Sequence, residues 1–595
     1  MFKIGKFAMA LFAASALASC GVSGFLGSEP KGGSQAAYEG NVMARDGTPL
    51  YTLVYLPSGP GPHPALVMRS PYDIPSAPPG GISTEVDDDD TAAAVSAWKP
   101  VLDRGYAVVM QNTRGRHRSG GEDSLFLTDR EDGYDLAAWV TAQPWSDGRF
   151  AVVGDSADGF SGLLMAAARP PGLKGVFVQA SCGSLLTDGV IRRTGAMQVE
   201  TLVPWFLAQA EDAGPDHRKL LGSAGSGDLA VRAERMAERL ARQLRPKPEE
   251  WLPRPLAGHP EISALLPKWA TFIGESGYAE RAAYLDAIAD IEVPVFHVGL
   301  WQDVFIDCTI EGFSRLQRRR GDQRLLVFEG THYDIDKPST WGRSPMLDWL
   351  DEVVRGRAPD RPADASVAFA VEGGGQVMRT ATSWPPLASA QTLYLQPGGN
   401  LTVTPPKDAF ALGTYEADAT RPLLTQGGRN LVVEAGALLQ DEPGRSSDVI
   451  AFRATPVAAD TILAGPVTLT ATLTSTAADA DLAARLVAVS PDGERQLIAD
   501  GLARARYRAG RAKPSALTPG VPVAVRVEIG HVARRLPAGH RLELYLSGSN
   551  FPRWDTNPNR DVDPVLATGS TPARVSLQTD PAEPARLDYS VLAGP

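Results

Sequence analysis

The stretch FAVVGDSADGF, residues 150–160, decides the fold of this chain. Its apolar start predicts a buried strand, the small residues from Gly154 to Gly159 predict a sharp turn, and residues 160–168 have helical spacing. This layout places the hydroxyl of Ser156 at the start of a helix, where small flanking residues leave it exposed. The pattern predicts a nucleophilic serine; the alternative is a serine that caps an ordinary helix.

Short apolar runs alternate with helical patterns around that turn. Such alternation predicts a mainly parallel sheet covered by helices, in an α/β domain that spans residues 38–184 and 286–360. Residues 185–285 are rich in Ala, Arg, Leu and Glu but lack strong strand patterns, and they predict a helical cap inserted into that domain. The predicted strands are residues 65–68, 107–110, 150–153, 175–179, 293–298 and 325–328, and the predicted helices are residues 130–142, 160–168 and 345–355.

A different periodicity begins after about residue 360. Apolar residues alternate with threonines between Val467 and Thr474, and the same two-residue period returns at residues 523–529 and 542–546. Strands of this kind bury one face and expose the other, as in an antiparallel sandwich. Residues 361–595 are therefore predicted to form a C-terminal β-sandwich.

The composition narrows the functional classes. The 595 residues include 58 Lys and Arg against 69 Asp and Glu, a net charge of −11, so a non-specific grip on nucleic acid is not expected. Three cysteines are too few for a disulfide framework or a four-thiolate zinc site. Past the N-terminus, no apolar run approaches the length of a membrane span.

The N-terminal 20 residues have the features of an export signal. Lys3 and Lys6 precede a short apolar stretch that ends in Leu-Ala-Ser-Cys20. This ending resembles the bacterial lipobox, in which the cysteine becomes the lipid-modified first residue. We expect residues 1–20 to be a lipoprotein signal peptide, residues 21–37 a flexible tether, and Cys20 the anchor to a bacterial membrane in the cell envelope. The alternative is an ordinary signal peptide and a soluble periplasmic or secreted protein.

A nucleophilic serine requires a base that is oriented by an acid. His332 follows one predicted strand and Asp303 follows the preceding one, so both leave the same edge of the sheet. Asp307 is the competing acid, although a charge in the first helical turn explains it equally well. The histidines at 531 and 540 fall in the alternating C-terminal half, where a polar turn or a solvent-exposed position is expected.

Ordered motifs along residues 40–590 resemble the cocaine-esterase/X-Pro dipeptidyl-peptidase (CocE/NonD) family of α/β-hydrolases, which includes the α-amino-acid ester hydrolases. These motifs are RSPYD (69–73), QNTRGR (111–116) with SGGE (119–122), DLAAW (135–139) with QPWSDG (143–148), GDSADG (154–159), GLWQD (299–303), and SNFPR (549–553) with NPN (557–559). The resemblance implies an α/β-hydrolase domain with a helical cap, followed by a jelly-roll β-sandwich.

The resemblance also implies roles for individual residues. Ser156 would be the nucleophile, Asp303 the orienting acid and His332 the general base, while the phenol of Tyr72 and the N–H of Ala157 would form the oxyanion hole. No metal or cofactor is implied. Two positions of this chain, Ala157 and Asn112, depart from the family pattern. The family usually has Tyr where this chain has Ala157, which removes a wall of the pocket. It has Asp at position 112, so Asn112 is expected to weaken a salt bridge with Arg114.

Substrate preference is less defined by the sequence. Phe305 matches a family position in the acyl pocket, and Trp205 and Asp188 are weaker pocket candidates; helix-face packing is the alternative for the two aromatic residues. Phe305 and Ile306 are apolar where α-amino-acid ester hydrolases carry acids that bind the substrate ammonium, so amino-acid esters are disfavoured.

The remaining cysteines, Cys182 and Cys308, follow consecutive predicted strands. A disulfide is allowed in the oxidising envelope, but two buried thiols are the expected state.

The sequence thus predicts a serine hydrolase that cleaves carboxylic esters, with amides as a further substrate class, through an acyl-enzyme. The alternatives are an X-Pro dipeptidyl-peptidase, an α-amino-acid ester hydrolase, and a non-enzymatic envelope binding protein with a vestigial site. The expected partners are a small ester or amide substrate and a membrane, and no oligomeric state is predicted.

Overall fold

The computed structural model describes residues 37–74, 98–184, 194–209, 214–216, 254–258, 263, 268–334, 345–358, 365–375, 377–443 and 448–592. The predicted signal peptide, Cys20 and Asp188 lie outside these ranges, as does much of the predicted cap. The tether prediction lies outside them except for its last residue.

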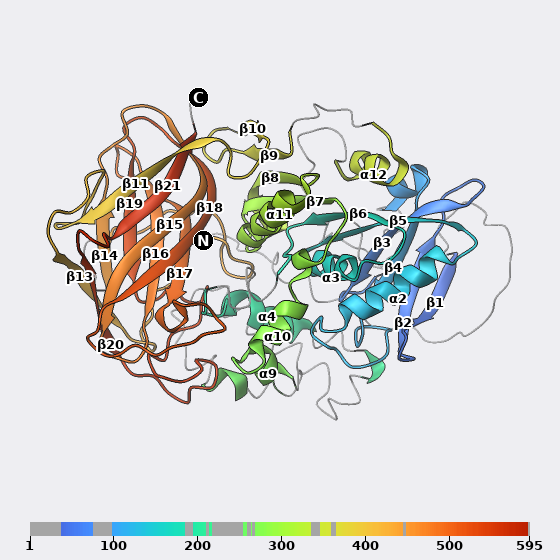
Figure 1. The fold of residues 1–595 in the computed structure, drawn as a ribbon, viewed down its shortest axis with the longest axis horizontal. Helices are drawn as coiled ribbons and strands as arrows, with labels where there is room; N and C mark the ends of the chain where they lie inside the picture. Colours follow the sequence, from blue (N-terminus) through green and yellow to red (C-terminus); the bar gives the residue numbers. More distant parts are fainter. Residues whose placement is uncertain are drawn as a thin grey trace, which may run out of the picture.

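Ten strands in the described part of the chain form one mixed sheet with the order β1-β2-β4-β3-β5-β6-β7-β8-β9-β10 (Figure 1). The run from β4 to β9 is parallel, and antiparallel pairs extend it at both ends. The strands are β1 (Tyr38–Met43), β2 (Pro49–Tyr55), β3 (His63–Ser70), β4 (Ala107–Asn112), β5 (Ser146–Asp155), β6 (Leu173–Gln179), β7 (Val295–Gln302), β8 (Arg324–Thr331), β9 (Val367–Ala370) and β10 (Met378–Ala381).

Helices cover both faces of this sheet, because neighbouring residues of each strand point to opposite sides. Val67 and Val152 pack against α2 (Asp129–Thr141) and α3 (Ser156–Ala167) on one face. Leu66 and Val153 pack against α12 (Pro345–Arg355) on the other. With α11 (Ile306–Arg320) packed on β7 and β8, the central strands are buried on both sides, which explains their continuous apolar runs.

The described part of the cap lies between the two domains in Figure 1. It contains α4 (Val199–Gln209), α9 (Trp269–Ile273) and α10 (Tyr278–Tyr284), with the short 3₁₀ turn η1 (Leu256–Gly258); the 3₁₀ turn η2 (Ala287–Ala289) follows where the chain returns to the α/β domain. Trp269 and Phe272 are buried in the same core as α3, so the cap packs directly on the helical layer of the sheet.

The described residues of the C-terminal domain form eleven strands, which are antiparallel to their partners except for β12 beside β14. Buried and exposed residues alternate along the first half of β18, as the two-residue period predicts. In β15 and β19 the predicted exposed face is wrong, because neighbouring parts of the protein cover it and bury Thr468 and Glu543. The strands are β11 (Ala388–Gln396), β12 (Asn400–Thr402), β13 (Phe410–Ala417), β14 (Val449–Arg453), β15 (Thr461–Ser475), β16 (Asp481–Val489), β17 (Arg495–Arg504), β18 (Val523–Leu536), β19 (Arg541–Ser547), β20 (Ala573–Thr579) and β21 (Arg586–Leu592). A short 3₁₀ turn, η4 (Ala505–Tyr507), follows β17, and another, η3 (His332–Asp334), follows β8 in the hydrolase domain.

The predicted fold class is confirmed: a mixed, largely parallel sheet is followed by a mostly antiparallel β-domain. Helix α3 starts at Ser156, four residues before its predicted start, because the turn residues 157–159 already belong to the helix. Within the described ranges, no helix has the length and apolar character needed to cross a bilayer.

One prediction about the β-domain is wrong. His531 is not at a turn or on the solvent face; it lies in β18 and is only 6% exposed. Its ring is buried because it lies between Trp384 and Glu311 of α11, each 3.0 Å from one ring nitrogen, so the strand faces the hydrolase domain there. His540 does lie in a turn.

Candidate active site

Ser156 stands at the junction of β5 and α3 with a φ of +49°, in the left-handed region that residues with a side chain rarely adopt. The turn has no room for larger neighbours. A Cβ on Gly154 would lie 2.5 Å from the backbone of Asp158, and one on Gly159 would lie 2.7 Å from Ser181. The glycines before and after Ser156 are therefore required by the tight approach of this turn to its own helix and to the segment after β6.

Asp303 and His332 meet beside this turn. Nδ1 of His332 lies 2.9 Å from Oδ1 of Asp303, which is fully buried, and the imidazole is only 4% exposed. Asp334 accepts hydrogen bonds from the N–H and the hydroxyl of Thr331, at 2.7 and 3.0 Å, and so fixes the 3₁₀ turn that carries the histidine. The carboxylate therefore holds one ring nitrogen and leaves the other for a partner.

Tyr72 lies at the same edge of the sheet, just after β3. Its hydroxyl is hydrogen-bonded to the side chain of Ser156 and accepts the indole N–H of Trp205 at 2.9 Å. Burial raises the pKa of the Tyr72 phenol, and the charge of Asp158 raises it further. The phenol consequently keeps its proton at neutral pH and can donate it to a hydrogen bond.

Two contacts hold the backbone of Tyr72. Its N–H donates to Oγ of Ser70 at 3.0 Å, and the amide of Asn112 donates to its carbonyl at 2.7 Å. An ionised Asp at position 112 would have no proton to donate to that carbonyl. The expectation that Asn112 weakens a salt bridge of Arg114 is therefore wrong, because Asn112 serves Tyr72 while Arg114 pairs with Asp46 and Asp132 at 2.7 and 2.6 Å.

Two carboxyl groups flank the serine. Burial raises the pKa of Asp155, and the nearby charge of His332 partly opposes that rise. Burial also raises the pKa of Asp158 well above its ordinary value, with Asp155 adding to the effect and a hydrogen bond from Ser70 opposing it. The charge of His332 thus acts on the residue before Ser156, as expected for segments that leave the same edge of the parallel sheet.

An aromatic cluster forms one side of the site. Phe126 lies between Phe160 of α3 and Trp205 of the cap. Its ring centroid is 5.0 Å from that of Phe160 and 6.1 Å from that of Trp205. A cavity beside them has a mixed lining, apolar at Phe126, Trp205 and Pro71, the neighbour of Tyr72, and otherwise mostly polar or charged: Thr113, Arg114, Arg116, Asp123, Ser124 and Asp129. Phe126 is not among the predicted site residues, because its one signal in the sequence is an apolar residue a few positions after the SGGE segment.

The remaining pocket candidates behave differently from one another. Phe305 is 8% exposed and its ring lies 5.6 Å from that of His332, so it is both a core residue and a neighbour of the imidazole. Tyr333, beside the histidine, is 54% exposed and was not singled out by the sequence. Asp188 lies outside the described residues, and the backbone of Ala157 follows Ser156 in the first turn of α3.

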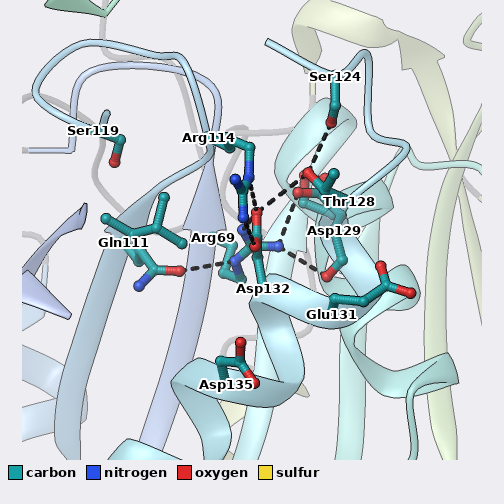
Figure 2. A network of polar contacts seen from close by, with 12 residues as sticks. Arg69, Gln111, Arg114, Ser119, Ser124, Thr128, Asp129, Glu131, Asp132 and Asp135 are labelled. Carbon is teal, nitrogen blue, oxygen red and sulfur yellow. Dashed lines mark hydrogen bonds and ion pairs between the residues drawn. The ribbon is translucent and has the colours of Figure 1, made fainter. Parts of the chain in front are cut away.

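A buried polar network locks the strands and helices behind the site (Figure 2). Arg69 at the end of β3 is fully buried and donates to the carboxylate of Asp129 at 2.9 Å and to Gln111 of β4 at 3.0 Å. The other carboxylate oxygen of Asp129 accepts the hydroxyl of Ser161 in α3, at 2.9 Å. The strand that leads to Tyr72 and the helix that begins at Ser156 are thus tied to the same carboxylate.

Cys182 and Cys308 form a disulfide, so the expectation of two buried thiols is wrong. Both residues follow neighbouring parallel strands, β6 and β7, and their Cα atoms are 5.3 Å apart, within the range that a disulfide spans. The bond links the segment behind the serine turn to the first helical turn after Asp303. Among the described residues, no group of three or more His, Cys, Asp or Glu is arranged to hold a metal ion.

Comparison with known proteins agrees with this geometry. The model of the X-Pro dipeptidyl-peptidase (S15) family matches residues 46–334, and that of the X-Pro dipeptidyl-peptidase C-terminal non-catalytic domain matches residues 361–588. The cocaine esterase of Rhodococcus sp. (strain MB1 Bresler) is 26% identical over 583 residues, which cover 90% of this chain and 94% of that protein.

Solved structures share the whole architecture. An aminopeptidase from the marine-sediment archaeon Thaumarchaeota archaeon superposes with a TM-score of 0.75 at 19% identity and covers 97% of this chain and 99% of its own. An α-amino-acid ester hydrolase superposes with a TM-score of 0.73 at 18% identity, covering 96% and 98%. These likenesses establish the common fold. Together with the two family models that span the hydrolase and β-domains, they show that this chain belongs to the CocE/NonD (S15) family of serine hydrolases.

Proposed function

We propose that this protein cleaves carboxylic esters through a covalent acyl-enzyme, with Ser156, His332 and Asp303 as its catalytic triad. The observation that carries the proposal is the 2.9 Å contact between Asp303 and His332 at the strand edge where Ser156 adopts its left-handed turn. An imidazole held on one side by a carboxylate can take the proton of a serine on the other.

The reaction follows from these positions. The Ser156 oxygen attacks the substrate carbonyl while His332 takes its proton, and the resulting oxyanion accepts hydrogen bonds from the Tyr72 phenol and the Ala157 N–H. The imidazolium then protonates the leaving alcohol, and the acyl group stays on the serine. Water, deprotonated by the same imidazole, attacks the acyl-enzyme and releases the acid.

An uncharged acyl group suits the surroundings of the serine. Phe126, Phe160 and Trp205 supply apolar surface on one side, and Phe305 packs beside the imidazole. In α-amino-acid ester hydrolases, two acids lie just after the catalytic Asp. The corresponding residues of this chain are Phe305 and Ile306, which are apolar and buried. We therefore favour simple esters over substrates whose charged amine must be held near the carbonyl.

An X-Pro dipeptidyl-peptidase is the second candidate, because the S15 family model and the aminopeptidase structure both carry peptidase names. Side-by-side turnover of a p-nitrophenyl acyl ester and an X-Pro anilide ranks the two. We expect faster ester cleavage; faster anilide cleavage would reverse the order, and a profile over acyl chain length would then define the pocket.

The first test is covalent labelling. A fluorophosphonate probe should label the wild-type protein, and Ser156→Ala should abolish labelling together with at least about 10⁴-fold of the turnover. Folded wild-type protein that takes no label would favour a non-enzymatic binding protein.

We also propose that the protein is exported and anchored in a bacterial envelope membrane through lipid on Cys20. The charged start, apolar stretch and Leu-Ala-Ser-Cys ending support this. Radiolabelled fatty acid should be incorporated into the wild-type chain and be absent from Cys20→Ala; label retained on that variant would contradict the anchor.

A further inference from the structure

The loop that carries Asp303 is short and is bracketed by two residues. Trp301 lies near the end of β7, and Asp307 lies in the first turn of α11. Only Asp303, Val304 and Phe305 separate the strand from the helix. Any group that fixes both Trp301 and Asp307 therefore fixes the position of the Asp303 carboxylate between them.

Arg429 of the C-terminal β-domain contacts both Trp301 and Asp307. Its Nε donates to the carbonyl of Trp301 at 3.1 Å, and its Nη1 lies 2.8 and 2.7 Å from the two carboxylate oxygens of Asp307. Nη2 donates to the carbonyl of His531 in β18. The guanidinium is 1% exposed, so one buried cation from the β-domain spans the ends of the Asp303 loop.

The β-domain makes room for this contact. Gly530, next to His531, has a φ of +120°, and a Cβ there would lie 2.1 Å from Nη1 of Arg429 and 2.8 Å from Asp307. The pairing of β15 with β18 also shifts at this point, between Gly530 and Glu528. A bulge of this kind turns the strand backbone toward the pair, and the N–H of His531 donates to Asp307 at 2.8 Å.

The segment that carries Arg429 is itself anchored to the cap. The carboxylate of Glu200, in the first turn of α4 and fully buried, accepts the N–H groups of Leu431 and Val432 at 3.1 and 2.9 Å. The same helix carries Trp205, which donates to Tyr72. Residues 429–433 therefore contact the loop that carries Asp303 at one end and helix α4 of the cap at the other.

We propose that Arg429 is a positioning residue for the hydrolase reaction: the β-domain, through this guanidinium, holds the loop of the triad acid at the distance His332 requires. The inference rests on the proposed function, in which Asp303 orients the imidazole. Misplacing a catalytic group by about 1 Å can cost about 10²-fold in rate. An enzyme without Arg429 should bind substrate normally and turn it over slowly.

The control must separate positioning from general stability. Arg506 matches Arg429 closely, since it also comes from the β-domain, is buried, and pairs with a carboxylate of the hydrolase half, Glu275, at 3.3 Å. Glu275 lies in the cap between α9 and α10, away from the Asp303 loop. Loss of Arg506 should weaken the interface without moving the triad acid.

The experiment compares Arg429→Gln, Arg429→Lys and Arg506→Gln with wild type, using kcat and KM for a p-nitrophenyl ester and thermal unfolding. We expect Arg429→Gln to lower kcat by about 10²-fold with KM within about threefold, and Arg429→Lys to recover part of the loss because its ammonium still pairs with Asp307. Arg506→Gln should keep kcat within about threefold while its unfolding temperature falls.

Gly530→Ala gives a second route if Arg429→Gln fails to fold, because it keeps both charges while its Cβ, which also strains the backbone, displaces the guanidinium and Asp307 from their present contact. We expect a kcat loss here too, with KM retained. Unchanged kcat in the folded Arg429 and Gly530 variants, or an equal loss in Arg506→Gln, would overturn the inference. The proposed function would stand in either case as long as wild type reacts with fluorophosphonate and Ser156→Ala does not.

Discussion

The parallel sheet and the C-terminal sandwich place their loops differently. In the parallel run from β3 to β8, every strand ends at the same edge, so Tyr72, Ser156, Asp303 and His332 meet there although they are far apart in the chain. In the sandwich, antiparallel neighbours end at opposite edges, and its loops are divided between them. The comparison shows that the parallel sheet gathers reactive groups by topology alone, whereas the β-domain contacts the Asp303 loop through separate segments, which include Arg429 and His531 of β18.

Buried ion pairs differ in how far their cations reach solvent, and the sandwich contains both kinds, since its Arg504 is as fully buried with Asp481 as Arg69 is with Asp129. Arg69 in the hydrolase domain is fully buried with its carboxylate partner. Glu543 in the sandwich is equally buried, but its partners Arg541 and Arg453 are 28% and 43% exposed. A buried cation depends on its partner, while a partly exposed one can turn to water.

The largest expected effect tests that difference with two matched amide substitutions. Asp129→Asn should lower the free energy of unfolding by about 3 kcal/mol, since it leaves the buried Arg69 with only the more distant carboxylate of Asp132, at 3.8 Å. Glu543→Gln should cost only about 1 kcal/mol, because its arginines reach solvent. Denaturant unfolding of both variants measures the two costs; equal losses would break the comparison.

The next effect concerns the phenols of the two regions. Tyr72→Phe should reduce kcat by about 10²–10³-fold with little change in KM, because it removes a donor to the developing oxyanion. Tyr415 in the sandwich is also buried and donates to the carbonyl of Asp481 at 2.7 Å, so Tyr415→Phe is the matched control. We expect Tyr415→Phe to lower the free energy of unfolding and to leave ester turnover intact. Steady-state kinetics on both variants check this; a loss of kcat in Tyr415→Phe that equals the loss in Tyr72→Phe would contradict the prediction.

The disulfide gives a smaller effect that is confined to one region. Replacing Cys182 and Cys308 together by serine should lower the stability of the hydrolase domain by about 2–4 kcal/mol, because the bond closes a long loop in the unfolded chain. Calorimetry with and without reductant checks this. Reductant should lower the unfolding transition of wild type and leave that of the double variant where it is; a wild-type transition insensitive to reductant would contradict the bond.

The smallest effect is a pH dependence of opposite sign in the two regions. Burial lowers the pKa of His297 in β7 to about 3, so this group binds a proton only after unfolding, and its contribution to stability is lost as the pH falls below 6.5. Between pH 6.5 and 5 the loss is about 2 kcal/mol. Burial raises the pKa of Asp479 in the sandwich to about 7, so its contribution is lost as the pH rises from about 4 to 7.

Two variants separate these contributions. Relative to wild type, His297→Leu should gain stability as the pH is lowered from 7 to 5, and Asp479→Asn should gain it as the pH is raised over the same interval. Unfolding temperatures measured at both pH values decide the matter. Parallel curves for wild type and a variant would show that the corresponding group does not titrate as its burial implies.

Periodicity in the sequence predicted the larger part of the fold. The six predicted strands of the hydrolase domain coincide with β3 to β8, and the helix predicted at residues 345–355 matches α12. The motif at Ser156 was readable because its glycines are required by backbone contacts only a few residues away. A motif whose contacts are local keeps the same residues at the same spacing, so it can be recognised before the tertiary structure is known.

The errors share one physical cause, since each depended on a partner distant in the chain. His531 lies in an alternating strand whose exposed face would ordinarily be wet, but the hydrolase domain covers it. The sequence assigned Asn112 to Arg114, whereas the fold brings it to the carbonyl of Tyr72. Proximity in space is not encoded by spacing in sequence when the partners belong to different strands.

By itself, then, the sequence determined the two kinds of sheet and the residues able to do chemistry, because both follow from local periodicity and from side-chain type. Only the tertiary structure decided which groups contact one another: Asp303 rather than the competing Asp307 holds His332, Cys182 is bonded to Cys308, and Arg429 contacts both ends of the Asp303 loop. These contacts join segments from different strands and domains, and their geometry is fixed by packing, which no local pattern records.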